Sequence, residues 1–112
     1  ATETEELVKD LVQAEYNNAC INWGATYNSL HEGYAILLEE VEEVEHCIEQ
    51  VRDKLDYIWS SIKLNRMEAV KSSVESFELH TKDTIKELAQ CGAVLMKIKN
   101  TFNTTTILHF LH

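Results

Sequence analysis

Two long segments of the chain carry apolar residues at spacings that alternate between four and three positions. Such spacing places the apolar side chains on one face of an α-helix, whereas a strand alternates every second residue. We therefore predict two long amphipathic helices, each on the order of 45 Å long at ~1.5 Å rise per residue. The first series is Leu37, Val41, Val44, Ile48, Val51, Leu55, Ile58 and Ile62, and the second, with two threonines, is Met67, Val70, Val74, Phe77, Thr81, Thr84, Leu88, Cys91, Leu95, Ile98 and Phe102.

The two long segments are separated only by residues 64–66, of which Asn65 tolerates the left-handed backbone of a tight turn. A turn this short makes the two helices antiparallel neighbours. Upstream, the spacing of Leu7 and Leu11 predicts a first helix from about Glu5 to Ile21. The fold class we predict is all-α: a single domain over residues 1–112, built as an antiparallel helical bundle whose two long helices form a hairpin.

The helix ends are marked less clearly than the helices. The loop after the first predicted helix ends at Ser29, which is placed to cap the next helix, with Glu32 completing a capping box. At the other end, the β-branched and capping-prone run Thr101–Thr106 predicts that the last long helix stops near Asn100, with at most a short helix beyond it from about Thr104 or Thr105.

The charge of the chain restricts its partners. The 112 residues carry a formal net charge of −9, with 45% hydrophobic and 26% charged residues. Such a surface repels nucleic acid and anionic membranes. The chain contains no apolar run of membrane-spanning length, and its first six residues are acidic rather than basic. We therefore expect a cytoplasmic protein that binds neither nucleic acid nor membrane. An odd count of three cysteines without a C-x-x-C pair argues against a disulfide framework or a zinc site.

Acidic side chains occupy matching positions on the two long helices. Glu40 and Glu43 lie three residues apart and share one helix face. Glu87 and Gln90 take the same two heptad positions on the second helix. An acidic run such as residues 39–45 is more often a solvated helix face. Here it flanks the apolar seam, and a hairpin that brings the two faces together can hold Mg²⁺ or Mn²⁺ through oxygen ligands.

These residues also resemble a known family. The segment Tyr27–Glu43, YNSLHEGYAILLEEVEE, resembles the first half of the MazG-like nucleotide pyrophosphohydrolases, particularly their phage and prophage members. The family pattern is Glu-Glu-x-x-Glu on one helix and Glu-x-x-Asp on a later one. Residues 39–43 fit the first half, and residues 87–90 fit the second with Gln90 in place of Asp. The two halves stand further apart than is usual, which a hairpin lengthened by whole heptads accommodates.

The resemblance implies an enzyme that hydrolyses a nucleoside triphosphate, NTP or dNTP, to the monophosphate and pyrophosphate. It implies a Mg²⁺ ion that neutralises charge on the phosphates, with no covalent nucleophile. The matching positions of this sequence are Glu40, Glu43, Glu87 and Gln90 for the metal and Glu39 for orienting or deprotonating the attacking water.

Other side chains are candidates for binding the substrate. Lys97 follows Gln90 by one heptad and shares its helix face, so it can contact phosphates. His31 precedes the acidic face by two turns and can contact base or phosphate, although a histidine near a helix start is more often a surface residue. Trp23, Tyr27 and Tyr34 can stack on a base, although aromatic residues at a loop–helix junction more often belong to the core.

Two alternatives come from the same residues. The long helices outrun the first helix, so we predict that Val51–Ile62 and Val70–Phe77 bury against another subunit of a homo-oligomer, a dimer or tetramer. The substitution at Gln90 and the long hairpin favour a second function, a helical-hairpin interaction protein that has kept the scaffold without catalysis. Di-iron chemistry is disfavoured, because its Glu-x-x-His motif occurs once, at Glu43–His46, and that chemistry needs it twice.

Overall fold

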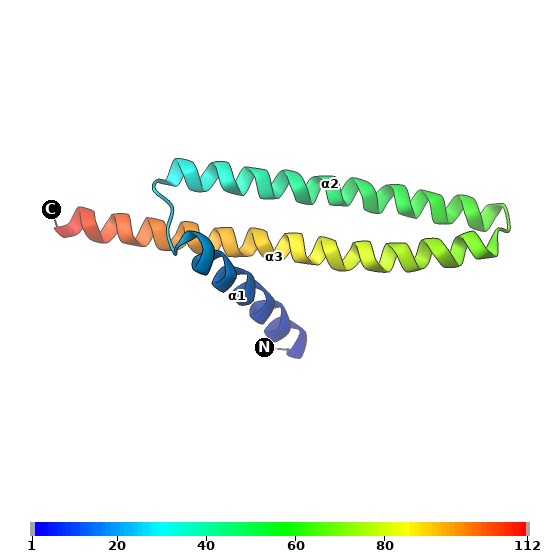
Figure 1. The fold of residues 1–112 in the computed structure, drawn as a ribbon, viewed down its shortest axis with the longest axis horizontal. Coiled ribbons are helices and arrows are strands. Elements are labelled where there is room, and N and C mark those ends of the chain that lie inside the picture. The colour runs from blue at the N-terminus through cyan, green and yellow to red at the C-terminus, as the bar shows by residue number, and fades with distance from the viewer. Residues whose placement is uncertain (1, 112) are drawn as a thin grey trace. The chain divides into compact units, whose positions relative to one another are not determined.

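The computed structural model describes residues 2–111, including the side chains of residues 2–104. Its helices are α1 (Glu3–Trp23), α2 (Leu30–Lys63) and α3 (Met67–Leu111) (Figure 1). The predicted all-α class is therefore confirmed, and α2 and α3 are the two long antiparallel helices. Helix α1 extends two residues beyond each predicted end. Within the described part of the chain, no helix combines the length and apolar content that crossing a membrane requires.

Helix α2 begins where the sequence predicts. The Ser29 hydroxyl accepts the backbone N–H of Glu32 at 3.1 Å, as an N-cap does. The Glu32 carboxylate reaches back one residue further than expected. It accepts the side-chain amide of Asn28 at 3.1 Å and the backbone N–H of Asn28 at 3.4 Å. The start of α2 is thus fixed by both halves of a capping arrangement, with Asn28 as the second partner.

The predicted end of the last helix near Asn100 is wrong, since α3 runs on to Leu111. The reason lies in how the first threonine of the run is satisfied. The Thr101 hydroxyl donates to the Lys97 carbonyl at 2.8 Å and accepts the backbone N–H of Tyr27 at 2.8 Å. A threonine held in this way does not compete with the helix for backbone hydrogen bonds.

The turn between α2 and α3 has the predicted chemistry. Asn65 has a φ of 56°, in the left-handed region that asparagine tolerates. The backbone N–H of Arg66 donates to the Ser61 carbonyl at 2.9 Å, and that of Asn65 donates to the Ile62 carbonyl at 3.0 Å. These bonds satisfy the last carbonyls of α2 and end the helix.

The chain divides into two compact units, residues 1–41 with 88–112, here called the terminal unit, and residues 42–87, the hairpin unit. Small residues let the helices of the terminal unit approach closely. A Cβ added at Gly33 on α2 would lie 2.9 Å from Ile98 Cγ1 on α3, and one added at Gly92 on α3 would lie 2.9 Å from Val12 Cγ1 on α1. Ala89 and Ala93 are the buried apolar residues among the described side chains.

The hairpin unit buries only half of its predicted apolar seam. Val44, Val51 and Ile58 are half-buried, whereas Ile48, Leu55 and Ile62 are exposed. Among residues 42–87, all of which the structure describes, the buried side chains are Ser61 and Thr84, and neither is apolar. Every second position of the predicted apolar series is therefore exposed within the hairpin unit.

Candidate functional site

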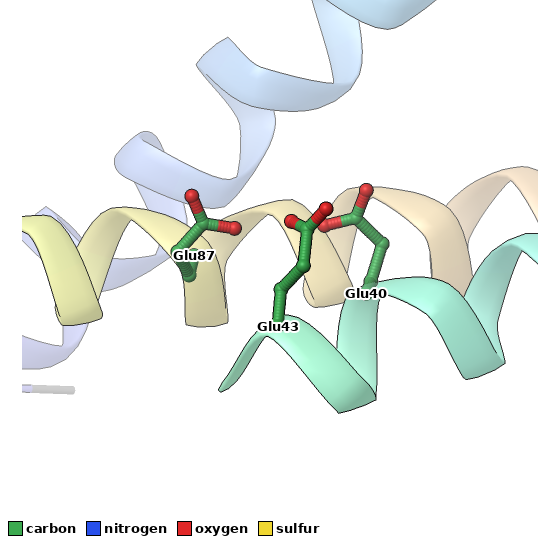
Figure 2. Close-up of side chains that lie close together, drawn as sticks. All are labelled: Glu40, Glu43 and Glu87. Carbon is green, nitrogen blue, oxygen red and sulfur yellow. The ribbon is translucent and has the colours of Figure 1, made fainter. Parts of the chain in front are cut away.

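Three of the four residues that the sequence predicts as metal ligands lie together. Carboxylate oxygens of Glu40, Glu43 and Glu87 lie within 4.8 Å of one another. Figure 2 shows Glu40 and Glu43 rising from successive turns of α2 and Glu87 from α3. Glu40 and Glu87 are half-buried, and Glu43 is exposed. The i, i+3 spacing of Glu40 and Glu43 puts their side chains on one face of the helix.

The chemistry of this donor set fits Mg²⁺. The ion prefers hard oxygen ligands at about 2.1 Å, so two oxygens that share it stand roughly 3 to 4 Å apart. The observed spacing of up to 4.8 Å therefore needs only small side-chain rotations. Acidic clusters are also common in proteins that hold no ion, so the donor set fits the metal without assigning it.

A pocket of about 660 Å³ lies within the terminal unit. This volume falls in the range of small-molecule sites. Residues from all three helices and from the α1–α2 loop surround it: Glu15, Asn18, Ala19, Asn22, Trp23, Thr26, Tyr27, Asn28, Glu32, Ile36, Glu40, Gln90, Ala93, Val94 and Lys97. The lining thus includes three predicted site residues, Glu40, Gln90 and Lys97.

Lys97 is held at the pocket wall by polar and aromatic groups. Its side chain is only 5% exposed. Its Nζ lies 4.3 Å from the centre of the Tyr27 ring, a cation–π geometry, and donates to the Trp23 carbonyl at 3.4 Å. A buried ammonium needs partners of this kind, and it gives the pocket a fixed positive charge suited to an anionic ligand.

The pKa of Tyr27 responds to negative charge in the same pocket, opposite in sign to that of Lys97. Burial raises the pKa of its phenol, and the negative charges of Glu40 and then Glu32 raise it further. The tyrosine therefore keeps its proton at pH values where a free phenol begins to lose it. The pocket combines one buried cation with carboxylates and aromatic rings.

The other predicted residues lie elsewhere. His31 and Glu39 are exposed on α2, and neither is among the described residues that line the pocket. Of the aromatic candidates, Trp23 and Tyr27 line the pocket, while Tyr34 is exposed outside its lining.

Helix α1 also contributes to the pocket, which the sequence did not predict. Asn18 and Asn22 line the pocket together with Glu15. Their spacing of three and four residues marks a polar face of α1, which was the available signal. Without the tertiary contacts, that face is indistinguishable from a solvated one.

The histidines that di-iron chemistry would require do not gather with carboxylates in the described part of the structure. A ring nitrogen of His46 lies 3.2 Å from the Gln50 amide nitrogen, and a ring nitrogen of His80 lies 3.0 Å from the Cys47 carbonyl. Among the described side chains, the group able to hold a metal contains carboxylates alone.

Comparison with known proteins assigns the chain to no group, because no family model, no curated protein and no solved structure matches it.

Proposed function

We propose that the protein is a Mg²⁺-dependent nucleotide pyrophosphohydrolase that converts an NTP or dNTP to the monophosphate and pyrophosphate. The observation that carries the proposal is the pocket of the terminal unit, which gathers Glu40, Gln90 and Lys97 with two aromatic rings. A nucleotide needs a surface for its base and cationic groups for its phosphates. The resemblance of Tyr27–Glu43 to the MazG-like family supports the same function.

Each side chain of the site has a distinct task in this proposal. Glu40, Glu43, Glu87 and the Gln90 amide oxygen are the groups that would hold the metal. When bound, Mg²⁺ supplies positive charge to the phosphate oxygens. Lys97 adds a second positive charge from the pocket wall.

Water is the nucleophile in the proposed reaction. Its oxygen bonds to the α-phosphorus, the bond from that phosphorus to the bridging oxygen breaks, and pyrophosphate leaves. Glu39 orients this water or takes its proton. Glu39 and His31 are exposed on α2 outside the described lining of the pocket, so in this proposal they act on water or substrate from the solvent side of the helix.

The test is pyrophosphate release from a panel of NTPs and dNTPs with Mg²⁺. We expect Glu40→Ala and Glu43→Ala each to lower turnover by at least ~10²-fold, the scale of losing one charge-stabilising group. Alanine favours helix, so circular dichroism should show unchanged helicity. Glu49→Ala, an exposed glutamate further along α2, is the matched control and should keep full activity. Full activity in the Glu40 or Glu43 variant removes that residue from the site.

A second candidate is an interaction protein that keeps the scaffold without catalysis. Two observations favour it: the neutral amide at Gln90, and the exposed apolar side chains of the hairpin unit. It predicts no pyrophosphate release from any member of the panel by a folded wild-type protein.

A further inference from the structure

We propose that the hairpin unit binds a second copy of this chain through one apolar face, here called the hairpin face. Its members are Ile48, Leu55, Trp59, Ile62, Met67 and Val74. The proposal is independent of the catalytic one, because no member of the hairpin face lines the pocket or belongs to the acidic cluster.

The seam inside the hairpin unit is narrow and contains as many polar as apolar side chains. On α2 its half-buried or buried positions repeat at spacings of three and four: Val44, Cys47, Val51, Lys54, Ile58 and Ser61. On α3 the same spacing gives Val70, Ser73, Phe77, His80, Thr84 and Glu87. Half of these side chains are polar or charged, so little apolar area leaves water when the two helices pair.

The remaining apolar residues form a second stripe on each helix. Ile48, Leu55 and Ile62 each follow an inner apolar residue of α2 by four positions. On α3, Val74 follows Val70 by four positions, and Met67 precedes it by three. The six members of the hairpin face are between 40% and 63% exposed.

Both stripes fall on the same side of the hairpin. Each is displaced from the inner seam by the same rotation about its own helix. In an antiparallel pair, the two helices turn in opposite senses when viewed from one end, so equal displacements point to one side. The two stripes therefore make one continuous two-helix surface, which is one half of a four-helix bundle.

A second copy is the occupant that this face fits best. Glu45 and Arg52 flank the stripe on α2, and Lys71 and Glu78 take the corresponding places on α3. A twofold interface sets a surface against itself, which a rim of one sign would oppose and a rim of both signs permits. A net charge of −9 disfavours an anionic lipid surface as the occupant.

The exposed area also suits a dimer. Six large apolar side chains that are about half exposed present on the order of 600 Å². With the stems of the flanking charged residues, this approaches the ~800 Å² that each partner contributes to a stable interface.

Sedimentation of the full chain tests the proposal without nucleotide. We expect wild type at twice the chain mass of 12.9 kDa or a higher multiple of it, and Leu55→Glu at reduced mass. Leu79→Glu is the matched control, because Leu79 is 65% exposed and lies on the side of α3 away from the hairpin face. A monomeric wild type at tens of micromolar overturns the proposal. So does a Leu55→Glu protein of unchanged mass, or equal dissociation in both variants.

Fluorescence of Trp59 gives a second test if Leu55→Glu fails to fold. In a Trp23→Phe background, Trp59 is the remaining tryptophan. We expect its emission to shift to longer wavelength on dilution, in step with the loss of mass, because dissociation exposes it to water. Emission that stays constant through dissociation places the interface elsewhere and overturns the proposal. Catalytic failure would leave both readouts unchanged, so the two proposals are tested separately.

Discussion

Tyr27 connects the backbone, the charge and the pocket of the terminal unit. Its N–H donates to Thr101, its ring lies under the Lys97 ammonium, and its phenol is affected by Glu40. The sequence marks it only as an aromatic residue near a helix start. Two of these three interactions, those with Thr101 and Lys97, come from residues that lie far from Tyr27 along the chain.

The pKa of Tyr27 gives a prediction at this scale. Its phenol has a pKa above the ordinary 10.0, so its contribution to stability is complete below pH 10 and is lost as pH rises through the folded pKa. We expect Tyr27→Phe to reduce the alkaline loss of stability, measured by denaturant unfolding across that pH range. The absorbance of tyrosinate, as the difference between wild type and Tyr27→Phe, gives the titration of Tyr27 itself.

A charge variant tests the cause of that shift. Glu40→Gln should lower the pKa of Tyr27 part of the way back, because burial and Glu32 still act on the phenol. Glu39→Gln, exposed and adjacent in sequence, is the matched control and should leave the Tyr27 titration in place. Equal shifts in both variants would mean that net charge, rather than the neighbouring carboxylate, sets the pKa.

Residues with local roles were predictable and those with distant partners were not. Ser29 caps α2 and Asn65 adopts left-handed backbone, as the sequence indicates, since each role depends on neighbours within a few residues. The burial of Lys97 and the hydroxyl bonds of Thr101 depend on the α1–α2 loop packing against α3. No spacing rule along one helix contains that information.

At the scale of helices, close approach in the terminal unit depends on two glycines. Gly92 lets α1 approach α3 at Val12, and Gly33 lets α2 approach α3 at Ile98. Both glycines lie within helices, where glycine costs about 1 kcal/mol relative to alanine. That local cost is offset by the contact it permits.

A double-mutant cycle measures that contact. We expect Gly92→Ala to destabilise the protein by about 1 kcal/mol, because the overpacking cost of ~1–3 kcal/mol exceeds the helix-propensity gain of ~1 kcal/mol. In a Val12→Ala background the clashing methyl groups are absent. There the same substitution should stabilise by up to ~1 kcal/mol.

Chemical denaturation of the four proteins provides the measurement. A Leu11→Ala background serves as the control, because the atoms nearest to the added Cβ all belong to Val12. In that background Gly92→Ala should cost as much as in wild type. If Gly92→Ala stabilises both backgrounds, the helices adjust their separation at no cost. If it destabilises both, the cost does not come from the contact with Val12.

Heptad spacing predicted the long helices and their pairing, but not which half of the stripe faces inward. Val44, Val51 and Ile58 pack inside the hairpin unit together with Cys47, Lys54 and Ser61, while Ile48, Leu55 and Ile62 are exposed. A stripe of two apolar positions per heptad is wide enough to serve two neighbours. Which apolar positions face which neighbour depends on every helix in the assembly. The pattern of a single chain does not say where the helices of another copy lie.

At the scale of the whole molecule, the excess of negative charge acts against folding. The chain carries a net charge of −9, and three of its carboxylates have oxygens within 4.8 Å of one another. Any added cation screens the general repulsion. Only a cation bound by the cluster adds stability through its own affinity, and the difference between these two effects is measurable.

We therefore expect Mg²⁺ to raise the melting temperature more than K⁺ at equal ionic strength and equal protein concentration. A ligand at 100 times its Kd stabilises the folded state by about 2.7 kcal/mol, which shifts the Tm of a chain of this size by roughly 10 °C. Glu43→Gln should lose the Mg²⁺-specific part and keep the screening part, whereas Glu49→Gln, exposed and outside the cluster, should keep both. Identical effects of the two salts on wild type would mean that the carboxylates are stabilised without a bound ion. The roles proposed for Glu40, Glu43 and Glu87 in holding the metal would then be wrong, while the binding surface of the hairpin unit would be unaffected.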